Sequence, residues 1–371
     1  MSTPFAIAAG GTGGHLFPAE ALAVELLEAG GNVHLLTDAR AEAFSGRVTA
    51  VEAHYVRAAQ LGGGAAQSAH ALGELALGTL QARRLLRRLV PSCVVGFGGY
   101  ASIPTMLAAV SLGLPTMIHE QNAVLGRANR LLTPRVRQLA TGFPSVSGLR
   151  AADRARVVHT GNPVRPAVLA IAHTKYKAPQ RGGPIELLVL GGSQGARIMS
   201  EVVPPALAAL PMRLREVLRV SQQARPEDLA DAEAIYRSNR VRVELRSFFD
   251  DVPERLARAH LVISRAGAST VAELAAVGRP TVMIPYPHAT DDHQAANARA
   301  FAEAGAGWVV AQSELRPDTF ALYLENLLGD PPALAEAACK ARDFGRPEAA
   351  RQLAQLAIEL GLAAKTQRWA A

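Results

Sequence analysis

The sequence is poor in the residues that build several common kinds of site. Its two cysteines, Cys93 and Cys339, stand in no C-x-x-C or Cys/His spacing, so neither a disulfide framework nor a cysteine-based metal centre is predicted. No G-x-x-x-x-G-K-[ST] is present, which excludes a P-loop, and no G-x-S-x-G marks a hydrolase nucleophile. Aromatic residues make up only 5% of the chain, so stacking surfaces are scarce and no nucleic-acid partner is expected.

Long hydrophobic runs are also lacking. The longest apolar stretch, residues 101–118, is interrupted by Pro104, Gly113 and Pro115. It therefore predicts a helix, a turn and a buried strand rather than a membrane span. The first residues lead into a short apolar run without a basic segment or a cleavage site, so no signal peptide is expected.

The pattern that is present is an alternation of short apolar runs with longer amphipathic ones. Over 371 residues it predicts two α/β domains with doubly wound parallel sheets. Buried strands are expected at 6–9, 33–36, 94–97, 116–119, 187–190, 261–264 and 281–285. Helices are expected at 18–29, 103–112, 200–209, 270–277 and 295–304.

An internal repeat supports two similar domains. A strand, a glycine loop and a helix occur around 94–112 and again around 262–277, each followed by a Gly-x-Pro-Thr turn and another strand. The glycine loops at 10–14 and 191–195 form a second matching pair. We expect an N-terminal domain over 1–162, a C-terminal domain over 163–342, and a helical segment over 343–371 that crosses back to the first domain.

The glycine loops predict a phosphate-binding cleft. A glycine loop between a strand and a helix lets backbone N–H groups and the helix dipole approach an anion. A nicotinamide site is one alternative: Asp38 ends a predicted strand where a ribose-binding acid would lie, but Leu16 replaces the third glycine of the fingerprint. No metal site is predicted, because the contiguous Asp291, Asp292 and His293 are a poor ligand set, and one of the two aspartates is expected to cap the next helix.

The net charge of +7 leaves an anionic partner open. In residues 80–89 four arginines alternate with leucines, a pattern typical of a helix lying on an anionic bilayer. The alternative is a solvated helix whose leucines lie in the core. The residues assigned to docking are Leu80, Arg83, Arg84, Arg87 and Arg88.

Taken in order, six motifs resemble those of the MurG family of peptidoglycan N-acetylglucosaminyltransferases. The resemblance runs from about Gly10 to Asn297, and the motifs are Gly10-Gly11-Thr12-Gly13-Gly14-His15, Gly98-Gly99-Tyr100, His119-Glu120-Gln121-Asn122, Gly161-Asn162-Pro163-Val164-Arg165, Gly191-Gly192-Ser193-Gln194-Gly195-Ala196 and Arg265-Ala266-Gly267.

The resemblance implies a GT-B fold and inverting transfer of N-acetylglucosamine from UDP-N-acetylglucosamine to lipid I, which forms lipid II. It implies no cofactor, and a peripheral location on the cytoplasmic face of the inner membrane. The implied partners are the donor, lipid I and the anionic membrane surface, together with other cell-wall and division proteins. Two alternatives remain: a UDP-N-acetylglucosamine 2-epimerase-like isomerase of the same fold, and an NAD-dependent dehydrogenase.

The same resemblance assigns site residues. Thr12, Gly13 and Gly14 would approach the transferred sugar or the acceptor diphosphate, and Asn122 and Gln294 would contact the donor sugar. Arg165 and Ser193 would contact the UDP diphosphate, and Phe249 would present backbone to uracil. The leaving diphosphate would meet a helix start, with Glu273 on the ribose; this segment comprises Ala268, Ser269, Thr270, Val271, Ala272 and Glu273.

Two residues are predicted to be catalytic. His15 is the candidate base, since histidine readily exchanges a proton near neutral pH. The alternative is that His15 only positions the acceptor diphosphate. Glu120 is expected either to orient its loop or to serve as a second candidate base.

Overall fold

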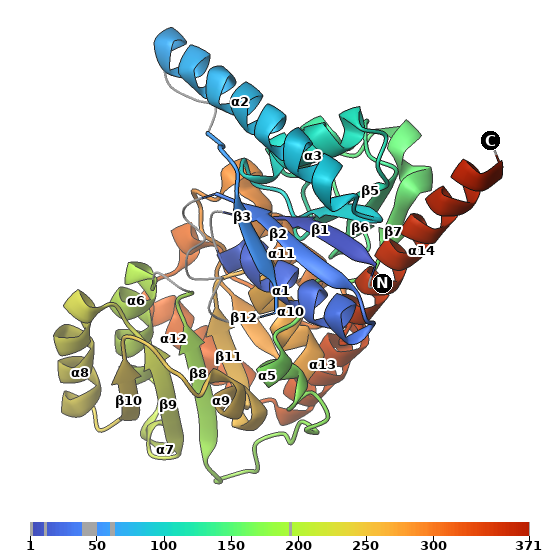
Figure 1. Ribbon diagram of the computed structural model, residues 1–371. Coiled ribbons are helices and arrows are strands. Elements are labelled where there is room, and N and C mark those ends of the chain that lie inside the picture. The colour runs from blue at the N-terminus through green and yellow to red at the C-terminus, as the bar shows by residue number, and fades with distance from the viewer. Residues whose placement is uncertain (1–2, 11–12, 39–49, 60–63, 193–194, 371) are drawn as a thin grey trace. The chain divides into compact units, whose positions relative to one another are not determined.

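The computed structural model describes residues 3–10, 13–38, 50–59, 64–192 and 195–370. It divides into two compact units, residues 1–165 with 346–371 and residues 166–345. The sequence-based boundaries at 162 and 342 fall three residues before these divisions. Both units are built on a fully parallel sheet, which matches the predicted fold class (Figure 1).

Unit 1 contains a seven-stranded sheet in the order β3-β2-β1-β4-β5-β6-β7. Apolar runs form its central strands, which are buried on both faces as parallel strands usually are. The strands are β1 (Pro4–Ala8), β2 (Asn32–Thr37), β3 (Glu52–Tyr55), β4 (Cys93–Gly96), β5 (Thr116–Glu120), β6 (Gln138–Thr141) and β7 (Val157–His159).

Helices cover both faces of this sheet. On one face Leu22 of α1 (Gly13–Glu28) and Leu353 of α14 (Ala349–Ala370) share a core with Ile7. On the other, Leu86 of α2 (Ala65–Leu89) and Met106 of α3 (Ser102–Ser111) pack over alternate residues of the same strands. The short α4 (Arg127–Leu132) and the 3₁₀ helix η2 (Ala151–Arg156) complete the unit. The C-terminal helix α14 thus packs on the first domain, against α1 and β4 (Figure 1).

Unit 2 repeats the plan with a six-stranded sheet in the order β10-β9-β8-β11-β12-β13. Numbered within each unit, both sheets begin 3-2-1-4-5, so the repeat seen in the sequence is a repeat of topology. The strands are β8 (Ile185–Leu190), β9 (Leu218–Gln223), β10 (Arg242–Arg246), β11 (Leu261–Ser264), β12 (Thr281–Met283) and β13 (Gly307–Val309).

The helices of unit 2 enclose a core centred on Val189 and Ile263. Met199 of α6 (Arg197–Ala208), Tyr236 of α8 (Leu229–Ser238) and Leu324 of α12 (Pro317–Leu328) fill one face of the sheet. On the other face α9 (Val252–Arg258) packs against β8, and α10 (Ala268–Val277) packs beside α9. The remaining helices are α5 (Pro166–Leu169), α7 (Met212–Arg215), α11 (His293–Glu303), α13 (Pro331–Phe344) and the 3₁₀ helices η3 (Pro226–Asp228), η4 (Thr290–Asp292) and η5 (Gln312–Glu314).

Candidate active site

The glycine loops follow the carboxyl ends of the two central strands in each unit, β1 and β4 in unit 1 and β8 and β11 in unit 2. This is the edge of an open parallel sheet where ligands bind. In unit 1 the two loops are in contact, because a Cβ on Gly10 would lie 2.5 Å from the Cβ of Ala101. The helix expected at 18–29 begins earlier, because Gly13 and Gly14 form the first residues of α1, whereas Thr12 and Ser193 lie outside the described residues.

His15 lies in the first turn of α1 beside the second glycine loop. Gly99 has a φ of +71°, and a Cβ there would come within 3.3 Å of the His15 ring. Nδ1 of His15 lies 3.1 Å from Oε1 of Gln121, a residue 106 positions away in the chain. The fold therefore joins the first glycine loop to the end of β5.

The orientation of the Gln121 amide decides which nitrogen of His15 carries a proton. Nε2 of Gln121 donates to the backbone carbonyls of Phe97 and His119, both at 3.0 Å. Those oxygens only accept, so Oε1 must face His15. His15 then donates from Nδ1, and its Nε2 keeps a lone pair, the form that a general base requires.

The side chain of His119 contacts the amide of Gln121. Nε2 of His119 donates to the carbonyl of Gly161 at 2.9 Å, and its Nδ1 lies 3.2 Å from Gln121 Nε2. Burial lowers the pKa of His119 from 6.5 to about 4, although the hydrogen bond to Gly161 opposes the shift. The ring is therefore neutral at physiological pH and holds a single tautomer.

The lowered pKa of His119 predicts that the fold loses stability at acidic pH. A histidine with a depressed folded-state pKa contributes stability above its unfolded pKa of 6.5, and the contribution is lost as the pH falls towards 4. The shift corresponds to about 3 kcal/mol. Urea unfolding from pH 7.5 to 4 should show the wild type losing about that much more than His119→Gln. Parallel pH curves for the two proteins would contradict the assignment.

Glu120 is buried and its carboxylate is fully used. Oε1 accepts from the backbone N–H and the side-chain amide of Asn122, at 3.0 and 3.3 Å. Oε2 accepts from the backbone N–H of Gly126 and from Asn129 Nδ2, at 2.9 and 2.8 Å. Of the two predicted roles, this arrangement favours orientation of the 120–129 loop, and it places Asn122 on the surface of that loop.

In unit 2 the loop after β11 leads into α10, whose first turn contains Ala268, Ser269 and Thr270. Gly267 precedes the helix without a side-chain cap, so no N-cap side chain satisfies the first N–H groups of α10. Val271 and Ala272 follow in the helix, and Glu273 is 9% exposed. Ser269 Oγ is buried with no hydrogen-bond partner in the described part of the chain.

Gln294 and Arg265 brace this loop. Oε1 of Gln294 accepts from the backbone N–H groups of Ala266 and Tyr286, at 3.3 and 3.0 Å. Arg265 donates to the carbonyls of Ile284 and Pro285, both at 3.0 Å. Because the side-chain oxygen of Gln294 already accepts two backbone N–H groups, the amide nitrogen is the part of the side chain that can donate to a ligand.

Two further predicted residues have distinct surroundings. The Phe249 ring is buried under the guanidinium of Arg255, 4.0 Å from its centroid. Arg255 in turn donates to Asp251 and Glu244, both at 2.8 Å, and no motif in the sequence indicates this support. Arg165 belongs to unit 1, where its guanidinium lies 5.7 Å from the Phe17 ring.

The helix cap expected from Asp291 or Asp292 is wrong for Asp292. It occupies the N-cap of α11 in a left-handed conformation, with φ +52°, and makes no side-chain capping bond. The left-handed backbone is the physical reason, because a capping side chain needs an extended N-cap to reach the N–H groups of the first turn. Nδ1 of His293 instead lies 2.7 Å from the carbonyl of Thr290.

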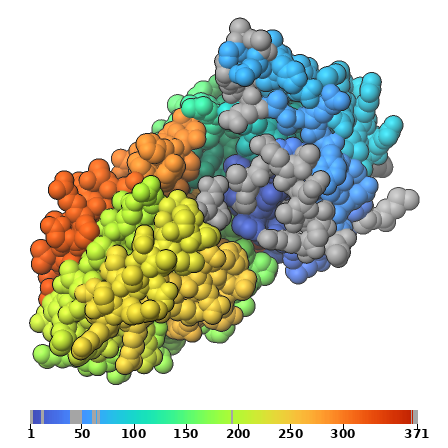
Figure 2. All heavy atoms as spheres, turned by 90° about the vertical axis from the view of Figure 1, so that its left-hand side faces the viewer, coloured from blue at the N-terminus to red at the C-terminus, as the bar shows by residue number. Residues whose placement is uncertain are grey.

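The basic helix is longer than expected, since α2 extends over Ala65–Leu89. Its first part projects beyond the rest of unit 1 (Figure 1) and lies at the surface in Figure 2. Leu72, Leu77 and Leu80 are 50–58% exposed. Arg84, Arg87 and Arg88 continue the exposed stripe. We call these six residues the α2 stripe.

Other residues of this helix face the protein. Leu86 is buried in the core, so the alternative interpretation of the leucines holds there. Arg83 donates to the carbonyl of Ser111 on α3 rather than pointing outward. The sequence missed Leu72 and Leu77 because the repeat of leucine and arginine begins only at residue 80. Within the described residues, no helix is both long and apolar enough to cross a membrane.

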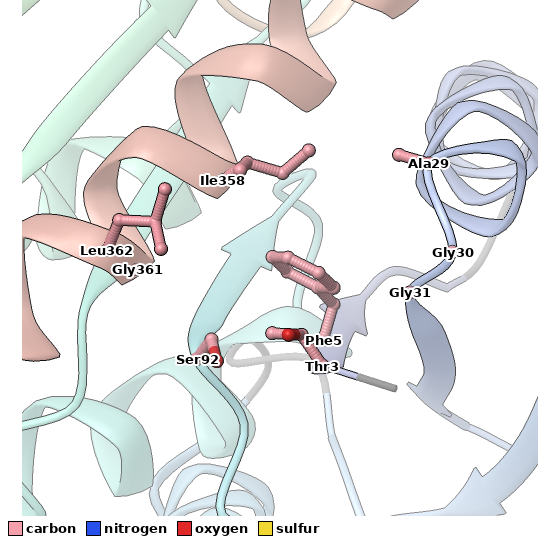
Figure 3. A pocket seen from close by; sticks show the side chains of 9 residues that line it. All are labelled: Thr3, Phe5, Ala29, Gly30, Gly31, Ser92, Ile358, Gly361 and Leu362. Atoms are coloured by element: carbon pink, nitrogen blue, oxygen red, sulfur yellow. The ribbon is translucent and has the colours of Figure 1, made fainter. Parts of the chain in front are cut away.

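A small pocket of about 100 Å³ lies elsewhere in unit 1 (Figure 3). It is lined by Phe5, Ser92, Gly31 and residues of α14, including Ile358. These residues stand at the amino ends of β1 and β4, opposite to the glycine loops, and sites for small molecules are usually about 300 Å³ or larger. The pocket is therefore not the active site.

Comparison with known proteins identifies the family. Residues 5–141 match the glycosyltransferase family 28 N-terminal domain, and residues 186–353 match its C-terminal domain. A protein of Rhodospirillum centenum named UDP-N-acetylglucosamine–N-acetylmuramyl-(pentapeptide) pyrophosphoryl-undecaprenol N-acetylglucosamine transferase is 56% identical, covering 96% of this chain and 94% of that protein. The crystal structure of Acinetobacter baumannii MurG matches with a TM-score of 0.80 at 30% identity, over 96% of this chain and 99% of that one.

The epimerase alternative is only distantly related. A UDP-N-acetylglucosamine 2-epimerase structure matches with a TM-score of 0.64 at 14% identity, over 95% of each chain, which shows a shared fold alone. The full-length likeness to the transferases covers both the domain that contains His15 and the domain that contains Glu273. The chain therefore belongs to glycosyltransferase family 28 and, within it, to the MurG family of N-acetylglucosaminyltransferases.

Proposed function

We propose that the protein transfers N-acetylglucosamine from UDP-N-acetylglucosamine to lipid I, with inversion at the anomeric carbon, and so forms lipid II. The observation that carries the proposal is the likeness to the named transferase over nearly the full length of both chains. The phosphate-binding character of the glycine loops fits this chemistry, since donor and acceptor both contain a diphosphate.

His15 acts as the general base in the proposed mechanism. Its Nε2 takes the proton of the acceptor hydroxyl while that oxygen attacks the anomeric carbon. The bond from that carbon to the phosphate oxygen breaks, and UDP leaves with the electron pair. The hydrogen bond from His15 Nδ1 to Gln121 supports this role, because it directs the lone pair of the ring to Nε2.

The start of α10 receives the leaving diphosphate. The N–H groups of Ala268, Ser269 and Thr270 in the first turn and the positive end of the helix dipole stabilise the charge that develops on UDP. Glu273 binds ribose hydroxyls, the Gln294 amide donates to the sugar, and the backbone of Phe249 faces uracil. Thr12, Gly13, Gly14, Asn122, Arg165 and Ser193 complete the proposed contacts. No metal is needed in this scheme.

The direct test is transfer of radiolabelled N-acetylglucosamine to a lipid I analogue. We expect labelled lipid II to form, and UDP to be released only when the acceptor is present. Release of UDP or formation of a 2-epimer without acceptor would support the isomerase instead and contradict the proposal.

The α2 stripe docks the enzyme on the cytoplasmic surface of the inner membrane. Its exposed leucines would enter the interface while its arginines meet anionic headgroups. An enzyme with a lipid-linked acceptor requires a surface that docks on the membrane. Other cell-wall or division proteins would contact the enzyme at the membrane.

Reversing two arginines of the stripe should release the protein from the bilayer. A basic residue near an anionic surface contributes about 1 kcal/mol, so Arg84→Glu with Arg87→Glu should weaken binding by about 2 kcal/mol or more, roughly thirtyfold. Cosedimentation with phosphatidylglycerol vesicles at low salt measures this. Arg154→Glu with Arg181→Glu, at two exposed positions elsewhere, gives the same change in net charge. Equal binding by both double variants would contradict the docking site.

A further inference from the structure

Three candidate metal ligands gather on the sheet of unit 1, outside the site described above. His34 lies on β2, and Glu52 and His54 lie on the neighbouring edge strand β3 (Figure 1). In the parallel register Glu52 stands opposite His34, and His54 stands opposite Leu36. Since side chains alternate along a strand, all three project from the same face of the sheet.

The three side chains bring one ligand atom each to within 4.8 Å of one another. Nδ1 of His34 lies 3.2 Å from Nε2 of His54, and the two oxygens of Glu52 lie near the two rings, Oε2 at 3.3 Å from His34 Nδ1 and Oε1 at 3.7 Å from His54 Nε2. Ligands bound to zinc at about 2.0–2.2 Å in a tetrahedron are separated by about 3.3–3.6 Å. We propose that His34, Glu52 and His54 form a zinc-binding site.

The donor set selects this kind of ion. Two imidazoles and one carboxylate suit Zn²⁺, whereas Mg²⁺ and Ca²⁺ prefer oxygen ligands only. The side chain of Glu52 is 66% exposed, while those of His34 and His54 are 6% and 17% exposed. The open side therefore lets water occupy the fourth position, as in sites with three protein ligands.

Asn32 stands beside the nitrogen of His34 that faces away from the proposed ion. Its Nδ2 lies 3.3 Å from His34 Nε2, and a ring bound to metal through Nδ1 requires the amide to rotate so that its oxygen accepts from Nε2–H.

Such an ion would fasten the edge strand that leads to α2. The carbonyl of Tyr55, next to His54, accepts from Gln81 of α2, and the backbone N–H of Arg57 donates to the same side chain. Arg57 also pairs with Glu74 at 3.2 Å. An ion that holds β3 against β2 would therefore stabilise the contacts between β3 and α2. The ion would take no part in the transfer chemistry.

The test uses the full-length protein, stripped of metal with a chelator and titrated with ZnCl2 in a calorimeter. We expect one Zn²⁺ per chain with a Kd in the micromolar range or below, and a higher melting temperature with the metal. His54→Ala should weaken binding by at least about a hundredfold, because losing a ligand exceeds the loss of an outer-shell partner. His173→Ala, at an exposed loop histidine, is the matched control.

Glu52→Gln provides a second variant that keeps the side-chain shape. It should also weaken zinc binding while leaving the circular dichroism spectrum unchanged. Co²⁺ bound to the wild type should show the visible bands of a tetrahedral site, and both variants should lose them. The proposal is overturned if the wild type binds no stoichiometric Zn²⁺, which would leave a proton-linked His–His–Glu cluster, or if both variants bind as the wild type does.

Discussion

Replacing His15 with alanine should lower kcat for transfer by about 10²–10⁴, the usual contribution of a general base. The KM for UDP-N-acetylglucosamine should stay nearly constant, because the proposed donor contacts centre on unit 2 and His15 lies in unit 1. Initial rates with a lipid I analogue measure both quantities. Full kcat in His15→Ala would rule out the base, and a rise in acceptor KM alone would indicate that His15 only positions the acceptor diphosphate.

Gln121→Leu tests the orientation of the base while the base itself stays in place. The variant keeps His15 but removes the acceptor that holds the proton on Nδ1. Both tautomers then become accessible, so we expect a smaller fall in kcat, on the order of tenfold, with unchanged KM values. Gln121 also donates hydrogen bonds to the carbonyls of Phe97 and His119, and the variant loses both. The unfolding transition of the variant must therefore be measured together with its kinetics.

The sequence predicted the central strands and the glycine loops because their signals are local. Buried parallel strands read as apolar runs, and strands such as β11 were placed at their observed bounds. Strands β6, β7, β9 and β13 were not predicted, and neither were the edge strands β3 and β10, which show the physical reason. Their residues are half-exposed and include charged side chains such as Glu52 and Arg242, so they contain no apolar run to detect.

Contacts between distant parts of the chain could not be predicted. Gln121 was visible only as part of a motif, and nothing in the sequence indicates that its amide faces His15. The cluster of His34, Glu52 and His54 depends on the register between β2 and β3, which places Glu52 opposite His34. Ligand spacing along one segment is the signal that sequence analysis can use, and this cluster has none.

Glu120→Gln should destabilise unit 1 and impair transfer together. Each carboxylate oxygen accepts two N–H groups, so an amide in either orientation would point its NH₂ at two donors. Leaving buried donors unsatisfied costs about 1–3 kcal/mol. Urea unfolding should show a loss of that size, and kcat should fall as the loop that contains Asn122 loses its fixed shape.

The comparison of stability with activity decides what Glu120 does. A catalytic base could be exchanged for an amide with little change in the free energy of unfolding, whereas a loop anchor could not. Glu74→Gln is a suitable control, because it removes a carboxylate that pairs with Arg57 at the surface and should change stability by less than about 1 kcal/mol. If Glu120→Gln lost transfer but unfolded like the wild type, Glu120 rather than His15 would be the stronger candidate for the base.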